Sequence, residues 1–468
     1  ESIDVMDGVG SNIRVDSRGR EVKRILPMLN EDVNEEWISD KTRYACDGLA
    51  KQRLDKPYVK KGGKLHSAAW HEALDVIGDK IRGLDGRKIA AIAGDQCDAE
   101  SMMALKGLMD GLGSPNIDCR QDGAKLGGGS RSGYVFNTTI AGIEDADVCL
   151  IIGSNPRLEA PIINARLRKR AGAGGFRVGI VGENVDLTYR TEHLGAGPDT
   201  LKEIADGTHP FCDVLRSAER PMLILGQGAL ARADGTAVIG AARLIADNTG
   251  MVSADWNGFN ILHTAAARVC GLDLGLMPGD GGRDVAGILD GAASSDIEVV
   301  YLLGADEIDV SKLTDAFVIY QGHHGDAGAS VADVILPGAA YTEKDGTYAN
   351  TEGRVQRGRR ATSPPGDARE DWAILRALSD VLGKTLPYNN IVELRAHMSE
   401  SVPVLGEIDT LTPSAWSDHG EIAEMDSAPF ESPVTNFYMT DPISRASETM
   451  AVCTETFVKE GQKTGTDG

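Results

Sequence analysis

The sequence contains few aromatic residues and no closely spaced pair of cysteines. Aromatic side chains make up 5% of the 468 residues, with only 8 Phe. No C-x-x-C motif occurs, so the sequence offers no recognisable zinc or iron–sulfur ligand set. An odd number of scattered cysteines predicts reduced thiols that serve as small buried hydrophobic residues. The seven are Cys46, Cys97, Cys119, Cys149, Cys212, Cys270 and Cys453.

Long apolar runs and positive charge are scarce as well. No run approaches the roughly 18–20 apolar residues needed to cross a bilayer, and the first residues lack the pattern of a secretory signal peptide. Any membrane association is therefore expected to come through partner subunits. The 48 basic and 70 acidic side chains give a net charge of −22, which argues against binding nucleic acid because it repels phosphate. The same excess of carboxylates would also simply keep a large protein soluble.

Glycine, by contrast, is abundant, with 56 residues, and it repeatedly follows a short apolar run. Continuous apolar runs of this length are typical of strands that are buried on both faces of a parallel sheet. The repeated unit predicts an α/β fold with two doubly wound parallel-sheet lobes. The six clearest units are Lys88–Gly94, Val148–Gly153, Val178–Gly182, Met222–Gly226, Val299–Gly304 and Phe317–Gly322.

The first 385 residues divide into two parts. Residues 1–60 are expected to form a small β-rich lobe, because Ser11–Val22 alternates polar and apolar residues around a Ser-Arg-Gly turn, as a hairpin does. Residues 61–385 are expected to hold the two α/β lobes. Ser67 is a candidate cap for the first helix of this part, whose apolar residues recur at three- and four-residue steps.

The last part, residues 386–468, has a different composition. A helix is expected over Ile391–Met398. The acidic, proline-containing stretch Glu407–Glu431 then predicts a loosely structured excursion that lies over another surface. The polar tail Lys459–Gly468 is expected to be disordered. The chain starts at Glu1 rather than Met, as expected of a fragment or a processed chain.

The glycines at the strand ends allow two interpretations. Nucleotide-binding folds place ligands at the carboxyl ends of parallel strands, where glycine permits close approach of a phosphate. Alternatively, each glycine simply closes a strand-to-helix turn. No G-x-G-x-x-G lies between a strand and a helix, and no P-loop is present, which favours the second interpretation.

Two polar clusters also allow alternatives. His323-His324-Gly325-Asp326 follows a predicted strand, but adjacent side chains of an extended chain point to opposite faces, which favours loop polarity over a metal site. The second cluster holds Glu343-Lys-Asp and Glu352-Gly-Arg354. Its carboxylates could serve acid–base chemistry or pair with Arg354, Arg357, Arg359 and Arg360. These patterns identify no catalytic, cofactor-binding or metal-binding residue.

Several longer segments of the sequence say more about the family of the protein than these motifs do. These segments are Tyr134–Asp147, Ile152–Pro161, Asn164–Lys169, Leu225–Gly235, Tyr320–Asp326, Ala332–Gln356 and Phe437–Ser447, with Ile25–Pro27 and Asn34–Lys41 near the start. They resemble the large iron–sulfur subunit of respiratory NADH:quinone oxidoreductase (complex I). The resemblance covers nearly the whole chain and is closest to the alphaproteobacterial and mitochondrial branch.

The resemblance implies the fold of the molybdopterin oxidoreductases. Those enzymes carry a four-cysteine cluster motif at the start of this region, whereas here only Cys46 precedes residue 97, so residues 1–60 would be a degenerate 4Fe-4S domain. They also place a Cys, selenocysteine or Ser on the metal. Asn116–Ala124 resembles that stretch, with Asp122 to Ala124 at the position of the ligand. The resemblance therefore implies a protein that keeps the fold of these enzymes but has lost their molybdenum cofactor.

The resemblance also implies a role in electron transfer from NADH to quinone by a proton-translocating enzyme. The 2Fe-2S and 4Fe-4S clusters would lie in an N-terminal region outside this chain, leaving no cofactor here. The expected partners are the flavin/NADH-binding and iron–sulfur subunits of the peripheral arm. The expected place is the cytoplasmic face of the bacterial inner membrane, or the matrix side of the mitochondrial one. The alternative is an active pterin- or nucleotide-binding oxidoreductase of the molybdopterin family.

Overall fold

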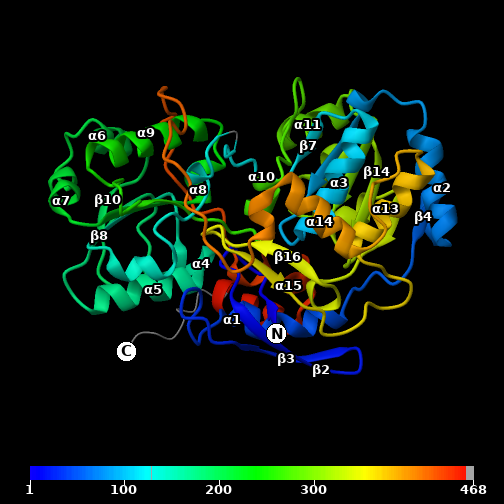
Figure 1. The fold of residues 1–468 in the computed structure, drawn as a ribbon, viewed down its shortest axis with the longest axis horizontal. Coiled ribbons are helices and arrows are strands. Elements are labelled where there is room, and N and C mark those ends of the chain that lie inside the picture. Colours follow the sequence, from blue (N-terminus) through cyan, green and yellow to red (C-terminus); the bar gives the residue numbers. More distant parts are fainter. Residues whose placement is uncertain (128, 460–468) are drawn as a thin grey trace.

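A computed structural model describes residues 1–127 and 129–459. The predicted tail therefore lies almost entirely outside the described residues. Figure 1 shows two α/β lobes side by side, with the N-terminal strands and the C-terminal helices below and between them. Among the described residues, no helix combines the length and the apolar character that crossing a bilayer requires.

The first lobe is built on a seven-stranded sheet with the order β5-β4-β15-β14-β13-β6-β7. The five strands from β15 to β7 are parallel, and β4 and β5 extend one edge as an antiparallel hairpin. The strands are β4 (Tyr58–Lys61), β5 (Lys64–Ser67), β6 (Ile89–Ala93), β7 (Asn116–Asp118), β13 (Val299–Leu303), β14 (Phe317–Gly322) and β15 (Val334–Pro337).

Helices cover both faces of this sheet. Alternate residues of β6 enter different cores: Ile89 packs with α2, α3 and α13, whereas Ala90 packs with α11 and α12. This two-sided burial explains why the strands read as unbroken apolar runs. The helices of this lobe are α2 (Trp70–Ile81), α3 (Ala99–Leu112), α10 (Arg268–Asp273), α11 (Val285–Ala293), α12 (Ala327–Val331), α13 (Asp371–Val381) and α14 (Ile391–Ser401).

The second lobe has a five-stranded parallel sheet with the order β10-β9-β8-β11-β12. Its strands are β8 (Val148–Ile152), β9 (Arg177–Val181), β10 (Glu192–Gly195), β11 (Pro221–Leu225) and β12 (Phe259–Ile261). Its helices are α4 (Pro156–Glu159), α5 (Pro161–Gly172), α6 (Pro198–Ala205), α7 (Phe211–Ser217), α8 (Gln227–Leu230) and α9 (Gly235–Asn248). The prediction of two parallel-sheet lobes, and of the six apolar strands within them, is confirmed.

The remaining elements lie at the base of the two lobes. The three-stranded antiparallel sheet β1-β2-β3 contains the predicted hairpin, whose turn at Gly19 has a φ of +64°. A second hairpin, β16-β17, crosses between the lobes. The elements are β1 (Ser2–Ile3), β2 (Asn12–Arg18), β3 (Glu21–Pro27), α1 (Asp40–Tyr44), β16 (Gly346–Ala349), β17 (Val355–Gly358), α15 (Pro442–Ala446) and α16 (Glu448–Cys453).

One local prediction is wrong. Ser67 is the last residue of β5 and does not cap a helix. The residue before α2 is Ala69, whose backbone N–H donates to Glu72 Oε2 at 3.1 Å. The strand extends further than the pattern indicated because Ser67 pairs with Tyr58 across the β4–β5 hairpin.

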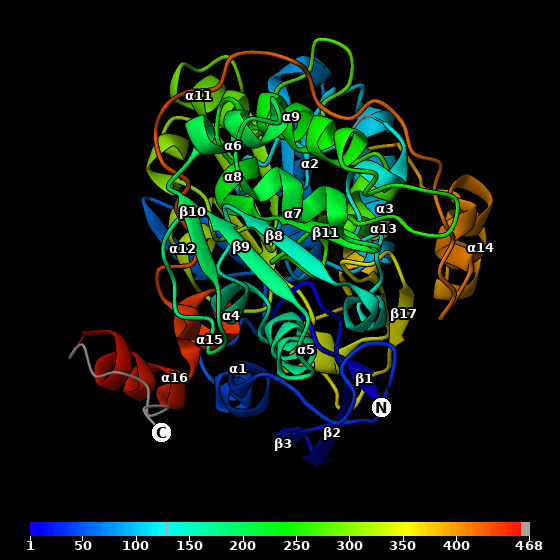
Figure 2. The same cartoon turned by 90° about the vertical axis from the view of Figure 1, so that its left-hand side faces the viewer.

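The acidic stretch after α14 crosses from the first lobe to the second. It runs in an extended form over α9, where the backbone N–H of Glu421 donates to the Thr236 carbonyl at 3.0 Å. Further on, the N–H of Phe430 donates to the Ala196 carbonyl at 2.9 Å. Figure 2 shows this segment arching over the second lobe before it returns toward α15. The segment thus connects both lobes to the C-terminal helices.

Candidate functional site

The main candidate site is a cavity between the two lobes, at the carboxyl ends of both parallel sheets. It encloses about 270 Å³. Asp95 follows β6, Asp122 follows β7 and Glu307 follows β13, while Glu159 and Thr264 follow strands of the second lobe. Ligand sites of open α/β folds lie at such strand ends. Residues 433–445 close the cavity from the C-terminal side.

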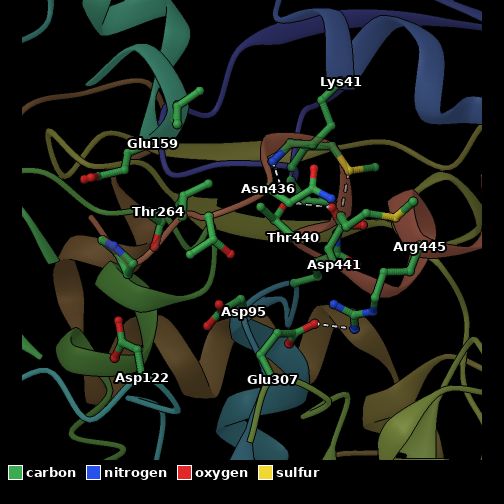
Figure 3. A pocket seen from close by; sticks show the side chains of 18 residues that line it. Lys41, Asp95, Asp122, Glu159, Thr264, Glu307, Asn436, Thr440, Asp441 and Arg445 are labelled. Atoms are coloured by element: carbon green, nitrogen blue, oxygen red, sulfur yellow. Dashed lines mark hydrogen bonds and ion pairs between the residues drawn. The ribbon is translucent and has the colours of Figure 1, made fainter. Parts of the chain in front are cut away.

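The cavity is acidic. Its lining includes five carboxylates but just two cations, Lys41 and Arg445. Figure 3 shows Arg445 and Glu307 facing each other across the lower part of the cavity. Arg445 Nη2 lies 2.6 Å from Glu307 Oε1, and its Nε lies 2.6 Å from Asp326 Oδ2. Gln121 Nε2 donates to the other Glu307 oxygen at 2.8 Å.

A second ion-pair network lies around the buried Arg268. Its Nη2 is 2.9 Å from Asp122 Oδ1 and 3.9 Å from Asp95 Oδ1. Burial raises the pKa of Asp95 from 3.8 to about 6, while Arg268 acts in the opposite direction. Asp122, at the position where the resemblance places a metal ligand, is therefore already bound to a guanidinium of the protein itself.

The upper part of the cavity is closed by hydrogen bonds to the C-terminal segment. Lys41 Nζ donates to Thr440 Oγ1 at 2.6 Å. On the second lobe, Glu159 accepts from Ser154 Oγ at 2.9 Å and from Ser432 Oγ at 3.0 Å. Burial raises the pKa of Glu159 above its ordinary value. These contacts use the polar groups that a ligand would otherwise need.

The cavity does not fit a molybdenum–pterin cofactor. Its volume lies below the roughly 300–1,000 Å³ of pockets for drug-sized ligands, and a pterin dinucleotide is larger than such a ligand. The phosphates of the cofactor would meet an excess of carboxylates, which raises the electrostatic cost of binding. Asp122, the side chain at the ligand position, is bound to Arg268.

The strand-end glycines pack against protein atoms. A Cβ on Gly94 would lie 1.9 Å from the carbonyl oxygen of Gly304, and one on Gly226 would lie 2.3 Å from Ser154 Cβ. Gly153, with a φ of +57°, approaches Ala229 in the same way. These glycines allow neighbouring strand ends and helices to approach each other, which supports the interpretation that they close turns.

The two adjacent histidines do not point to opposite faces, so that expectation is wrong. His323 Nδ1 lies 2.5 Å from His324 Nδ1, because both residues follow the end of β14, where the chain bends. His324 Nε2 lies 2.9 Å from the Gly48 carbonyl oxygen. Burial lowers the pKa of His324 to about 4. Among the described residues, no group of three or more His, Cys, Asp or Glu is arranged to hold a metal ion.

The second polar cluster forms buried ion pairs. Glu352 pairs with Arg354 at 2.8 Å, as one of the two interpretations predicted. Glu343 does not pair with the nearby arginines; instead Arg53 holds it through two contacts of 2.6 Å. Lys344 lies between Asp98 and Asp371, at 2.6 Å from each. Glu343 and Glu352 are thus held in ion pairs, whereas the exposed Asp345 accepts a hydrogen bond from the Arg360 backbone N–H at 3.0 Å.

Sequence patterns did not single out Asp95, Glu159, Lys41, Arg268, Glu307 or Arg445 of the cavity network. Lys41 and Arg445 lie within segments that resemble the family, but nothing in those segments indicated that the two residues share a cavity. Arg268 and Glu307 belong neither to a motif nor to one of the segments that resemble the family. Glu307 lies three residues after Gly304, the glycine that follows β13, and this position at a strand end is a signal that could have identified it.

Comparisons with known proteins place this fold and cavity in a class. Residues 53–381 match the family model described as molybdopterin oxidoreductase, and the chain has the fold of that class. Residues 413–453 match a model of the C-terminal part of the NuoG-type component of NADH-ubiquinone oxidoreductase. The chain belongs to the family of this component, which is also named the 75 kDa subunit or iron–sulfur protein 1 of the enzyme.

Similar proteins come from mitochondria and from Rickettsia. Identity is 47% to the mitochondrial NADH dehydrogenase [ubiquinone] iron–sulfur protein 1 of Solanum tuberosum, over 97% of this chain and 61% of that protein. It is 44% to the corresponding NADH-quinone oxidoreductase component of Rickettsia bellii, over 97% and 65%. It is 43% to the 75 kDa subunit of Reclinomonas americana, over 98% and 68%. The chain thus spans about two thirds of the length of these relatives.

A solved structure of low sequence identity shares the fold. The acetylene hydratase of Pelobacter acetylenicus superimposes with a TM-score of 0.62 at 12% identity, covering 86% of this chain and 72% of that one. At such identity the likeness concerns the fold alone.

The N-terminal lobe also has a match. Residues 1–47 match the 4Fe-4S domain model of NDSU1/NuoG-like proteins. A segment related to a 4Fe-4S domain therefore lies within the chain, which qualifies the expectation that cluster-binding regions lie entirely outside it. Cys46 is the one cysteine of this segment.

Glu307 is expected to make stability depend on pH. Burial raises its pKa from 4.5 to about 8, against the opposing effect of Arg445. A carboxyl whose pKa is higher in the folded state stabilises the fold below its unfolded pKa, and this stabilisation is lost as the pH rises through the folded pKa. Between about pH 5 and pH 8.5, the wild-type free energy of unfolding should fall by on the order of 3–4 kcal/mol more than that of Glu307→Gln.

Urea unfolding at several pH values checks this expectation. The exposed Glu36 serves as a control, since Glu36→Gln should keep the pH dependence of the wild type. An identical pH dependence of wild type and Glu307→Gln would contradict the assignment.

Proposed function

We propose that the chain is part of a subunit of NADH:quinone oxidoreductase and serves there as a cofactor-free scaffold of the peripheral arm. The observation that carries the proposal is 43–47% identity, over nearly the whole chain, to relatives named as subunits of that enzyme. In this role the lobes support electron transfer from NADH to quinone. The iron–sulfur clusters that carry the electrons belong to the part of the relatives that this chain does not span.

The cavity supports the scaffold role over an active pterin enzyme. Five carboxylates line it, and Arg268 and Arg445 of the chain contact Asp122 and Glu307 directly. The protein thus provides partners for Asp122 and Glu307 itself, as expected where no cofactor is bound, whereas Asp95 Oδ1 and Gln96 Oε1 of the lining lack a hydrogen-bond partner among the described residues. A nucleotide or pterin phosphate would have to displace these contacts.

The N-terminal lobe supports the same role. A 4Fe-4S cluster is held by four cysteine thiolates, whereas residues 1–47 contain Cys46 alone. Burial raises the pKa of the Cys46 thiol, which disfavours the thiolate that binds iron. We infer that residues 1–60 form a degenerate cluster domain, followed by the α/β lobes to residue 385 and the C-terminal part from residue 386.

The place of the chain follows from the same proposal. Its partners are the flavin/NADH-binding and iron–sulfur subunits of the peripheral arm. The chain associates with the membrane through those subunits, on the cytoplasmic face in a bacterium or on the matrix side in a mitochondrion.

Elemental analysis of the purified chain tests the scaffold role. We expect molybdenum, tungsten and iron each below about 0.1 atom per chain, because residues 1–127 and 129–459 hold no group of three or more His, Cys, Asp or Glu arranged to bind a metal. A pterin fluorescence assay on the denatured protein should likewise be negative. Stoichiometric pterin with molybdenum or tungsten would overturn the scaffold role, and about four iron atoms per chain would assign a cluster to the N-terminal lobe.

A further inference from the structure

Five exposed arginines lie at the tip of the β2–β3 hairpin, on β17 and at the start of the segment after β17, which bonds to the hairpin tip. They are Arg18, Arg20, Arg357, Arg359 and Arg360. Among the described residues, no carboxylate forms an ion pair with any of them within 4.0 Å, although Arg14, Arg24 and Arg53 nearby are all paired. In a chain with a net charge of −22, such a concentration of unpaired positive charge requires an explanation.

Two of these arginines, Arg18 and Arg20, line a defined groove. Ser17 Oγ donates to the Ala361 carbonyl at 3.2 Å, and Thr362 Oγ1 donates to the Gly19 carbonyl at 3.2 Å. These bonds fix the hairpin tip against the segment after β17. The groove between them encloses about 340 Å³. We call it the arginine groove. Its lining also includes two carboxylates, but Glu343 is paired with Arg53 and Glu21 with Lys23, so Arg18 and Arg20 remain as charges without an ion-pair partner among the described residues. The other polar side chains of the lining are Thr342, Thr362 and Ser363.

The chemistry of the arginine groove suits an acidic polypeptide. Guanidinium groups bind carboxylates through two parallel hydrogen bonds. Arg360 is already oriented, since its Nη2 donates to Ser363 Oγ at 2.6 Å and its Nε donates to the Thr362 carbonyl at 2.9 Å. The remaining lining includes Val22 and Leu49, which provide apolar surface beside the charges. Arginine surrounding an apolar centre is typical of protein–protein interfaces.

We propose that the arginine groove docks an acidic segment of another subunit of the assembled enzyme. The proposal rests on the proposed function, because it needs an assembly that contains this chain. Phosphate-rich partners fit less well, because the charge of the whole chain repels long polyanions. An acidic segment of a polypeptide, in contrast, places a few carboxylates on the guanidinium groups without approaching the rest of the acidic surface.

The test reverses the charge of the groove in the assembled enzyme. Arg18→Glu, Arg20→Glu and Arg360→Glu are combined in the full-length tagged subunit, and the assembled enzyme is purified through the tag. We expect the yield of assembled enzyme to fall by about ten-fold, since like charges would then face the partner. Raising the salt concentration should weaken the wild-type association as well.

A matched control reverses three exposed arginines elsewhere: Arg87→Glu, Arg168→Glu and Arg190→Glu. This variant carries the same change in charge and should assemble as the wild type does. Thermal unfolding of both isolated variants should stay within about 2 °C of the wild type, because exposed substitutions seldom alter stability. Assembly of the groove variant at wild-type yield, or an equal loss in the control, would overturn the proposal.

A photo-crosslinking amino acid in place of the exposed Glu21, at the groove, identifies the occupant in the assembled enzyme. A cross-link to a segment rich in Asp and Glu supports the proposal. Cross-links to a neutral or basic segment, to lipid or to nucleic acid overturn it. If the wild-type chain itself does not assemble with the other subunits, the proposed function fails. If instead the groove variant assembles at wild-type yield, only the docking proposal fails.

Discussion

Replacing Lys344 by methionine is expected to lower the free energy of unfolding by about 3–5 kcal/mol, because it leaves two buried carboxylates without a partner. The Lys344 side chain is 6% exposed and lies 2.6 Å from both Asp98 and Asp371. Burial opposes its charge, but the two carboxylates outweigh burial and hold its pKa well above the ordinary value.

The carboxylates cannot move to water when the lysine is removed. Asp98 caps α3 by accepting from the Ser101 N–H at 2.8 Å, and Asp371 accepts from Gln321 Nε2 at 2.9 Å. Urea unfolding measures the loss. Lys312→Met is the control, since Lys312 pairs with Asp290 on the surface, where such pairs contribute little. Equal shifts of the urea midpoint in both variants would contradict the role of Lys344.

Gly153→Val is expected to destabilise the second lobe by more than about 3 kcal/mol, through backbone strain and overpacking together. Gly153 directly follows β8 and has a φ of +57°, and a Cβ there would lie 2.6 Å from Ala229 Cβ and 2.7 Å from its nitrogen. A β-branched residue tolerates neither the backbone conformation nor the space.

Thermal unfolding and the yield of assembled enzyme together measure the effect of Gly153→Val. In the control Gly172→Val, at the end of α5, the added Cβ meets no atom within 4 Å apart from the neighbouring backbone of its own helix, so that variant should assemble normally. Under the scaffold proposal Gly153→Val lowers assembly, and any enzyme that does assemble turns over normally. Normal assembly with lost turnover would instead assign Gly153 to a catalytic site.

The strands were predictable from the sequence because their signal is local. A run such as Val148–Ile152 is buried on both faces, so each of its residues must be apolar. The fold class followed from the repetition of such runs. The end of β5 was not predictable, since the pairing of Ser67 with Tyr58 outweighs its tendency to cap a helix.

The cavity network was much less predictable, because its contacts join residues that lie far apart in the sequence. Glu343 pairs with Arg53, 290 positions earlier, although four arginines lie closer in sequence. Arg445 reaches Glu307 over 138 positions. The family resemblance placed Asp122 at the position of a lost metal ligand. No local sequence pattern, however, indicated that Arg268 would bind it.

The order in which the strands pair has a consequence for synthesis of the chain. In the first lobe, Ile89 of β6 lies beside Val299 of β13, with the entire second lobe between them in sequence. At roughly 5–20 residues per second on the ribosome, the edge of β6 stays unpaired on that side for about 10–40 s after it emerges. An exposed apolar strand edge is prone to aggregation. The chain would therefore need a chaperone most during the part of its synthesis before β13 emerges and pairs with β6.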